Sequence, residues 1–224
     1  MFFFKKKFDH VNCIDGCTLF EDYTNHSYWE NNEVTSDEKE ISNFLNEKNL
    51  IKNKKLLHIG VGNSYLALNL NQFDILEGLT ISSNELDKAN NLSIKNYKVY
   101  FKNKYSKNDL IQNREGYYDI IIDNNLKSFA CCNNAFNDLI YKYKKYLKVN
   151  GFIISSLRGM SWSRIVKPVY AFSLKKLFYK RLKEFDGPTH NLMNISDCKE
   201  LSNKFKFEMN LISRHLITFK KIHE

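Results

Sequence analysis

The residues Leu56-Leu57-His58-Ile59-Gly60-Val61-Gly62-Asn63-Ser64 are the most informative stretch of this 224-residue chain. The stretch begins with a short apolar run typical of a buried strand, and two glycines follow directly. Ser64 then begins a helical pattern, so the order is strand, glycine turn, helix. In an α/β sheet this order marks the carboxyl end of a strand, where an anionic or nucleotide ligand binds.

The two glycines suit such a ligand site. Gly60 and Gly62 have no Cβ, so the backbone can turn sharply and approach a ligand closely. A nicotinamide dinucleotide fingerprint needs a third glycine at the position of Tyr65, which argues against NAD. We therefore predict that the loop binds a different cofactor.

Alternating strand and helix patterns surround the glycine turn. Upstream, Thr35 and Glu38 match a capping box that begins a helix of about 13 residues. The other expected strands span 75–81, 97–101, 117–123, 152–156, 205–212 and 215–219, and the other expected helices span 64–70, 83–89, 135–147 and 196–203. This alternation predicts an α/β fold: a doubly wound, mostly parallel seven-stranded sheet with helices on both faces and a C-terminal antiparallel hairpin.

The composition indicates a folded protein of one domain, residues 1–224. Hydrophobic residues make up 43% and aromatic residues 14%, with only 8 Gly and 2 Pro, which excludes disordered and collagen-like chains. The 34 basic and 25 acidic residues give a net charge of +9, which would favour nucleic acid. However, only five of the basic residues are Arg, the residue preferred for phosphate and base recognition, so nucleic acid is a less favoured partner.

Targeting and metal signals are weak. No segment has the length of a membrane span, and the start MFFFKKKF lacks the apolar core of a signal peptide. The five cysteines form no paired C-x-x-C sets. We therefore expect a cytoplasmic chain with reduced cysteines and no metal site.

Four segments resemble those of class I S-adenosylmethionine-dependent methyltransferases, in the same order and spacing. They are the glycine loop 57–64, the string Glu77-Gly78-Leu79-Thr80-Ile81-Ser82, the strand Tyr118–Asp123 and the turn Tyr146–Phe152. The resemblance covers roughly residues 35–156 and the terminal hairpin. It implies an enzyme that binds S-adenosylmethionine and transfers its methyl group, with residues 1–34 as an N-terminal extension and 157–194 as a cap over the acceptor site.

The first and second motifs depart from the family pattern, since His58 and Thr80 stand where the family usually has an acidic residue. The resemblance implies nine cofactor-binding positions: His58, Gly60, Gly62, Asn63, Thr80, Ile81, Asn103, Asp123 and Asn124. Trp29 is a tenth candidate, because aromatic faces attract a cation such as the sulfonium of the cofactor. Asp123 and His190 are the candidate catalytic residues. His190, just beyond the expected cap, is the first choice for the base that removes a proton from the acceptor, and His26 is the second.

The charge distribution bears on the acceptor. Residues 139–183 contain twelve basic and no acidic residues, which leaves 9 − 12 = −3 for the rest of the chain. This favours a small acceptor that is anionic or linked to a glycan or lipid, or an anionic membrane surface to which the protein is peripheral. Two alternatives remain open at this point, an RNA methyltransferase and a methyltransferase-like binding protein without catalysis.

Overall fold

The computed structural model describes residues 34–70, 72–106, 108–127, 130, 133–158 and 193–222. The helices in these ranges are α1 (Ser36–Glu47), α2 (Tyr65–Asn69), α3 (Ser83–Asn91), α4 (Asn133–Tyr146) and α6 (Ile195–Phe205). The strands are β1 (Lys55–Ile59), β2 (Ile75–Thr80), β3 (Tyr97–Phe101), β4 (Tyr118–Asp123), β5 (Leu147–Ser156), β6 (Phe207–Leu211) and β7 (Leu216–Lys221).

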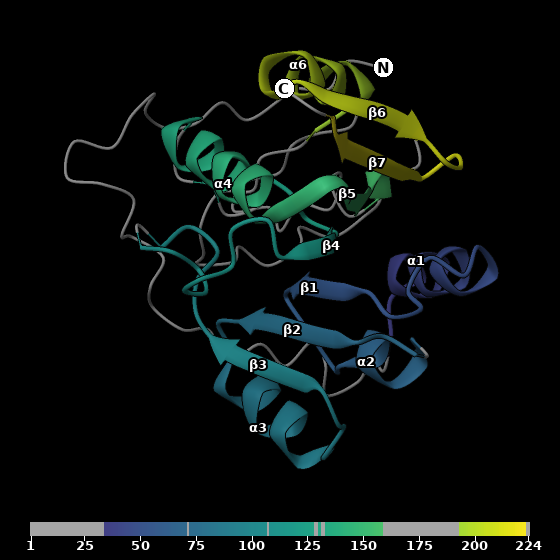
Figure 1. Ribbon diagram of the computed structural model, residues 1–224, viewed down its shortest axis with the longest axis vertical. Coiled ribbons are helices and arrows are strands. Elements are labelled where there is room, and N and C mark those ends of the chain that lie inside the picture. The colour runs from purple at the N-terminus through teal and green to yellow at the C-terminus, as the bar shows by residue number, and fades with distance from the viewer. Residues whose placement is uncertain are drawn as a thin grey trace, which may run out of the picture.

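The strands form one seven-stranded sheet in the order β3-β2-β1-β4-β5-β7-β6 (Figure 1). The first five strands pair in parallel, and β7 pairs antiparallel with both β5 and β6. The predicted doubly wound sheet with its C-terminal antiparallel hairpin is therefore confirmed.

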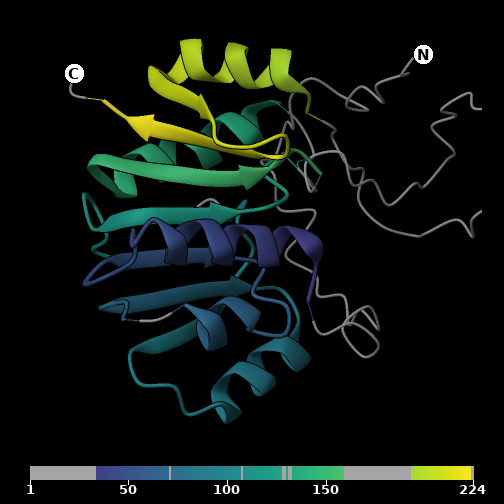
Figure 2. The ribbon, with the colours of Figure 1, turned by 90° about the vertical axis from the view of Figure 1, so that its right-hand side faces the viewer.

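Helices cover both faces of the sheet, as predicted. On one face, Ile41 and Leu45 of α1 and Leu66 of α2 pack with alternate strand residues such as Leu56 and Ile122. On the opposite face, side chains of α4 and α6 pack against the residues in between. Figure 2 shows α1 crossing the near face of the sheet with α4 behind it. Since residues alternate between the faces along a strand, near-continuous apolar strands such as β4 are what a sheet buried on both sides requires.

A buried carboxylate ties the neighbouring strands of this sheet together. Glu77 of β2 accepts hydrogen bonds from Tyr118 of β4, from Tyr100 of β3 at 2.7 Å and from two guanidinium nitrogens of Arg114 at 2.8 and 2.9 Å. Burial acts to raise the pKa of Glu77, but these donors outweigh it and hold the pKa below its usual value. The charged pair therefore fixes the loop before β4 onto β2.

The structure corrects two local expectations. The N-cap of α3 is Ser82, whose hydroxyl accepts from the Glu85 amide at 3.4 Å, rather than Ser83. The fifth strand begins at Leu147 and not at Phe152, because Asn150 has φ 64 and makes an irregularity within the strand instead of a turn before it.

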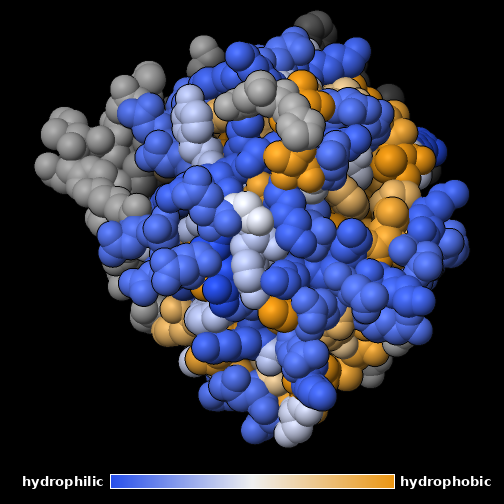
Figure 3. Space-filling view, viewed as in Figure 1, coloured by the Kyte–Doolittle hydropathy of each residue, from blue (hydrophilic) through white to orange (hydrophobic). Residues whose placement is uncertain are grey.

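The surface shown in Figure 3 is largely hydrophilic, with hydrophobic side chains in small groups. No helix among the described residues is both long and apolar enough to cross a membrane. The cytoplasmic location and the peripheral membrane association stay predictions. Trp29 and His190 lie outside the described residues, as do 1–33 of the expected extension and 159–192 of the expected cap.

Candidate functional site

The candidate site lies at the carboxyl ends of β1, β2 and β4. Ile59 of β1 is level with Leu79 of β2 on one side and with Asp123 of β4 on the other. The chain runs from β1 to β2, whereas β4 lies on the opposite side of β1, so the order of strands reverses there. In open α/β sheets ligands bind in the crevice at such a switch point. The next residues, Gly60, Thr80 and Asn124, line this edge.

The glycine loop turns away from β1 in a conformation that favours glycine. Gly60 has φ 74 and Gly62 has φ 52, both in the left-handed region. The Gly60 amide donates to the Leu79 carbonyl at 2.8 Å, which holds the loop beside β2. A Cβ built on Gly60 would meet no atom of the described residues within 4 Å, so the space that they leave beside this exposed glycine is open to a ligand.

Contacts with residues of β2, α3 and β3 hold the rest of the glycine loop. The side chain of Val61 occupies the space over Gly78, where any Cβ would overlap it. The Lys88 ammonium donates to the Asn63 carboxamide oxygen at 2.6 Å, and the hydroxyls of Ser64 and Tyr97 lie 2.8 Å apart. These contacts hold the loop in place before a ligand arrives.

His58 lies directly before this loop and is 2% exposed. By strand alternation its side chain shares the face of Leu56, toward α1 and α2. Within the described part of the chain no residue hydrogen-bonds its ring, and burial lowers its pKa to about 4. His58 is therefore a neutral group beneath the glycine loop.

Thr80 ends β2 with its hydroxyl already engaged. The hydroxyl donates to the Glu85 carboxylate at 2.6 Å and accepts from the Ser82 amide at 3.0 Å. This contact brings the Glu85 carboxylate to the end of β2, while Ile81 follows half-buried. Sequence reasoning missed Glu85, although the helix start at Ser82 could have located it, because the N3 position of a cap lies close to the preceding strand end.

Asp123, predicted to act in catalysis and cofactor binding, has hydrogen bonds to both of its carboxylate oxygens. Oδ1 accepts from the Asn125 amide and from Lys104, at 3.1 and 3.2 Å. Oδ2 accepts from Lys104 at 2.9 Å and from Tyr143 at 2.8 Å. Burial lowers the pKa of Lys104, whereas Asp123 opposes this shift. In this arrangement Asp123 stabilises the turn after β4, because its carboxylate accepts from the Asn125 amide and from Lys104.

The turn after β4 has two unsatisfied acceptors. The carboxamide oxygens of Asn124 and Asn125 are buried and accept no hydrogen bond from the described residues. Such atoms are rare in folded proteins, and donors of a bound ligand could satisfy them. Asn103, expected near the adenine, follows β3 and accepts from the Tyr105 amide at 2.9 Å, so part of its side chain organises its own turn.

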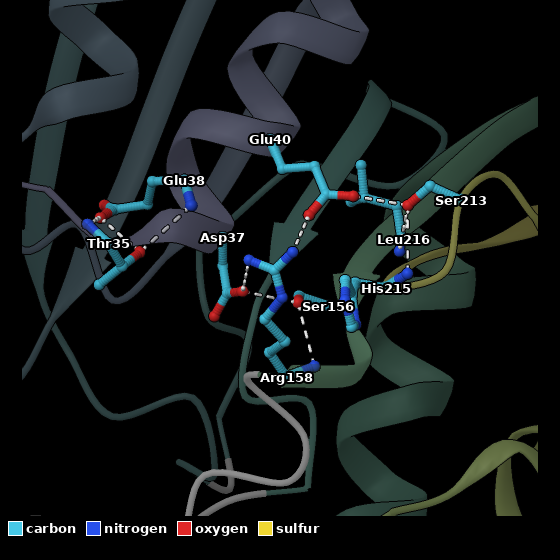
Figure 4. Close-up of polar contacts among 9 residues, drawn as sticks. All are labelled: Thr35, Asp37, Glu38, Glu40, Ser156, Arg158, Ser213, His215 and Leu216. Atoms are coloured by element: carbon cyan, nitrogen blue, oxygen red, sulfur yellow. Dashed lines mark hydrogen bonds and ion pairs between the residues drawn. The ribbon is translucent and has the colours of Figure 1, made fainter.

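A polar cluster lies beside this edge, where α1 meets the ends of β5 and β7 (Figure 4). Ser156 donates to Asp37 at 2.9 Å and Arg158 donates to Glu40 at 2.9 Å. We call this cluster the α1–β5–β7 junction, and its members are Asp37, Glu40, Ser156, Arg158, Ser213 and His215.

The junction is held by the β6–β7 turn. The Ser213 hydroxyl donates to Glu40 at 2.5 Å and accepts from the backbone amides of His215 and Leu216 at 3.1 and 3.0 Å. Burial raises the pKa of Asp37, and the hydrogen bond from Ser156 opposes this shift. Sequence reasoning did not find the junction, because its residues come from three distant segments.

Two described lysines of the basic segment 139–183 lie elsewhere, whereas Lys142 donates to the Ser106 carbonyl and Arg158 of the same segment belongs to the junction. Lys148 is bound to Asp119 at 2.8 Å and Lys145 lies 3.7 Å from Glu115, both near the amino end of β4. They are therefore at the opposite edge of the sheet from the candidate site. Among the described residues, no group of three His, Cys, Asp or Glu side chains could hold a metal ion.

The sequence matches no protein-family profile and no curated protein. Solved structures do match. An S-adenosylmethionine-dependent methyltransferase from Methanosarcina mazei superposes with a TM-score of 0.59 at 13% identity, over 80% of this chain and 98% of that one. The N-methyltransferase NodS from Bradyrhizobium japonicum gives a TM-score of 0.56 at 11% identity, over 83% and 97%.

The [4+2]-cyclase SpnF also matches, with a TM-score of 0.51 at 15% identity, over 84% of this chain and 65% of that one. A methyltransferase and a cyclase thus share one architecture with this chain. One fold thus carries different reactions, and the residues of the site determine which reaction a chain performs.

Proposed function

We propose that this chain binds S-adenosylmethionine at the carboxyl edge of β1, β2 and β4 and transfers the methyl group of this cofactor to a small acceptor. The chain has the fold of the class I S-adenosylmethionine-dependent methyltransferases. The resemblance in the sequence motifs is confirmed at the level of the fold. The observation that carries the proposal is Gly60, which has a positive φ and open space beside it at the point where the strand order reverses.

The polar groups of the edge suit this cofactor. S-adenosylmethionine carries a sulfonium and an ammonium group, and both are cations. The edge offers the Glu85 carboxylate at the end of β2 and two buried, unsatisfied carboxamide oxygens after β4. Oxygen acceptors of this kind complement a cationic ligand, and Glu85 stands in for the acidic residue that Thr80 replaces.

The contribution of the chain to methyl transfer is mainly positioning. The cofactor, when bound, supplies an electrophilic methyl group. The glycine loop fixes one end of the ligand, and the turn after β4, which Asp123 and Lys104 hold rigid, fixes the reacting region. Holding two reactants in line is the main source of acceleration in such a displacement.

Calorimetric titration with S-adenosylmethionine and S-adenosylhomocysteine tests this proposal, with Gly60→Ala as the diagnostic variant. A Cβ there projects into the open space, so we expect at least tenfold weaker binding. The control is Gly116→Ala, because Gly116 also has a positive φ, 57, and open space around its Cβ position, but precedes β4 at the other edge. Both variants incur roughly 1–2 kcal/mol of backbone strain.

The paired outcome separates strain from ligand contact. Equal affinities of the two variants, or no heat from the wild-type protein with either ligand, would overturn the proposal. Binding without methyl transfer would instead favour a second candidate, a non-catalytic ligand-binding protein. The neutral His58 and the occupied Thr80 hydroxyl are the features that favour it.

A further inference from the structure

The amino edge of the sheet brings together basic side chains that are far apart in the sequence. Lys54 and Lys148 lie 3.5 and 2.8 Å from the two oxygens of one carboxylate, that of Asp119. The Lys221 ammonium donates to the Leu147 carbonyl at 2.9 Å, because β7 ends beside the start of β5 (Figure 2). We call this surface the amino-edge patch, and its basic members are Lys52, Lys54, Lys55, Arg114, Lys145, Lys148 and Lys221.

The patch keeps a positive charge after its ion pairs are counted. Four carboxylates adjoin it, namely Asp74 beside Lys54, Glu77 against Arg114, Glu115 against Lys145, and Asp119. Seven basic against four acidic groups leave a net charge of 7 − 4 = +3, and the neighbouring pair of Lys220 and Glu208 adds none. Lys52, Lys54 and Lys145 are exposed, so this charge reaches solvent.

Two exposed aliphatic side chains stand among these charges. Asn150 has φ 64, and Val149 beside it, near the start of β5, is 43% exposed. Ile222 is 40% exposed and follows Lys221 at the end of β7. A single exposed aliphatic side chain is ordinary on a protein surface. Aliphatic side chains among lysines, however, are the combination with which a protein surface enters the headgroup region of a membrane.

We propose that the amino-edge patch docks this chain on the surface of a bilayer that contains anionic lipids. The ammonium groups of the patch are attracted by the negative potential of such a surface, and Val149 and Ile222 enter between the headgroups. This inference goes beyond the proposed methyl transfer and does not depend on it.

A nucleic acid fits this surface less well than a bilayer does. RNA is bound through guanidinium groups that hold phosphates with two hydrogen bonds, and through aromatic rings on which bases stack. The guanidinium of Arg114 already donates from two nitrogens to Glu77, at 2.8 and 2.9 Å. Lys55 and Arg114 each lie 4.3 Å from the centroid of the Tyr117 ring, so these cations occupy the stacking surface of that ring.

Docking through this patch determines which way the candidate site faces. The six residues of β2 or β4 lead from the amino edge to the carboxyl edge, a distance of about 20 Å at roughly 3.3 Å per residue. The glycine loop therefore opens on the side away from the bilayer. The carboxylates of Asp37 and Glu85 belong to this far edge, and an anionic surface repels them, which favours the same orientation. The acceptor then reaches the site from water and not from the docked membrane.

Sedimentation of the full chain with vesicles tests this inference. The vesicles consist of phosphatidylcholine alone or of phosphatidylcholine mixed with phosphatidylserine. We expect the chain to sediment with the mixed vesicles only, and to be released by added salt, because salt screens the attraction between exposed charges.

Two pairs of variants locate the docking surface. Lys52→Gln with Lys145→Gln removes two exposed charges of the patch and should weaken binding to the mixed vesicles at least fivefold. The matched control is Lys39→Gln with Lys199→Gln, which removes the same charge from exposed residues of α1 and α6 outside the patch and should leave binding unchanged.

The aliphatic contact has its own control. Val149→Ser should weaken binding at least threefold, whereas Ile195→Ser should not. Both side chains are 43% exposed, but Ile195 begins α6 and lies at the far end of this helix from Phe207, which pairs with Lys221 of the patch.

Losses confined to the patch variants support the inference. Equal losses in patch and control variants overturn it, and so do equal binding to both kinds of vesicle and an absence of binding to either. Tighter binding of a duplex RNA than of the mixed vesicles also overturns it and assigns the patch to nucleic acid. Calorimetry with S-adenosylmethionine is a separate measurement, so a failure of docking and a failure of the proposed function are distinguishable.

Discussion

His58 illustrates how one residue can change the electrostatics of an otherwise conventional loop. The ring is almost fully buried and its pKa falls to about 4, so it is neutral at ordinary pH. A carboxylate in its place would need compensating donors, because isolated buried charges are costly. The glycine loop of this chain is therefore supported by a neutral group, and the negative charge of the edge comes from Glu85 and the junction.

The neutral state of His58 predicts a pH-dependent stability. In the unfolded chain the ring takes up a proton below its ordinary pKa of 6.5, whereas the folded protein takes it up only near 4. The free energy of unfolding should therefore fall as the pH falls through this window, by about 3 kcal/mol in total from this residue. Urea titrations of His58→Leu should show a smaller fall. Identical pH dependence of variant and wild type would contradict the assignment.

Glu85 provides a second test at the level of one residue. Glu85→Gln keeps an oxygen that can accept from Thr80 but removes the charge. We expect about tenfold weaker binding of S-adenosylmethionine, because hydrogen bonds to a charged group contribute roughly 1.5–3 kcal/mol. Asp87→Asn is the control, since Asp87 lies on the same helix, away from the contact with Thr80. Equal affinity of both variants in calorimetry would remove Glu85 from the site.

The residues that sequence reasoning located are those whose role is local. Gly60, Gly62, Asn63 and Thr80 sit at strand ends that follow from apolar runs and turn residues. Glu85 was missed although its contact with Thr80 is local, because the N-cap of α3 was expected at Ser83 instead of Ser82. The junction was missed because its contacts depend on tertiary packing, which spacing along the chain does not reveal. Asp123 was placed correctly at the end of its strand, but the donors that occupy it, such as Lys104, come from another loop.

At the scale of elements, the contact between Val61 and Gly78 joins the glycine loop to β2. A Cβ at Gly78 would overlap Val61 and come within 3.2 Å of Val99. Because Val61 stands between Gly60 and Gly62 in the chain, displacement of Val61 should move both glycines. Gly78 is thus required for packing, because only a residue without a Cβ leaves room for the Val61 side chain of the glycine loop.

This contact predicts a rescue. Gly78→Ala should lower the free energy of unfolding by about 1–3 kcal/mol through overpacking, and should weaken cofactor binding. Val61→Ala makes room for the new methyl group, so the double variant should be less destabilised than the sum of the two single variants. Thermal unfolding and calorimetry measure both effects, and strictly additive losses would contradict the contact.

Element boundaries could be predicted best where a strong local signal begins or ends them. The capping box at Thr35 and Glu38 begins α1 as expected, with reciprocal hydrogen bonds of 2.9 and 3.2 Å. β5 was misjudged because Asn150-Gly151 has the composition of a turn. Leu147 pairs with Tyr118 of β4 before these residues and Phe152 pairs with Ile120 after them, so the strand continues across an irregularity at Asn150-Gly151 and tertiary contacts override the local preference.

At the scale of the whole molecule, the two edges of the sheet differ in their charged and polar groups. The amino edge carries described lysines that are paired with nearby carboxylates, as in Lys148 and Asp119. The carboxyl edge carries the open glycine loop, unsatisfied oxygens and an acidic junction. The net charge of +9 therefore says little about the site, because the charges that matter there are local.

The junction has a further consequence, for the order in which the molecule assembles. Its hydrogen bonds join residues 118, 119 and 173 positions apart, whereas the contact from Lys88 to Asn63 spans only 25. Contacts between distant residues form slowly, because a long loop must close first. A growing chain can thus complete the contacts of its glycine loop early, while the junction forms only after the final hairpin has been made.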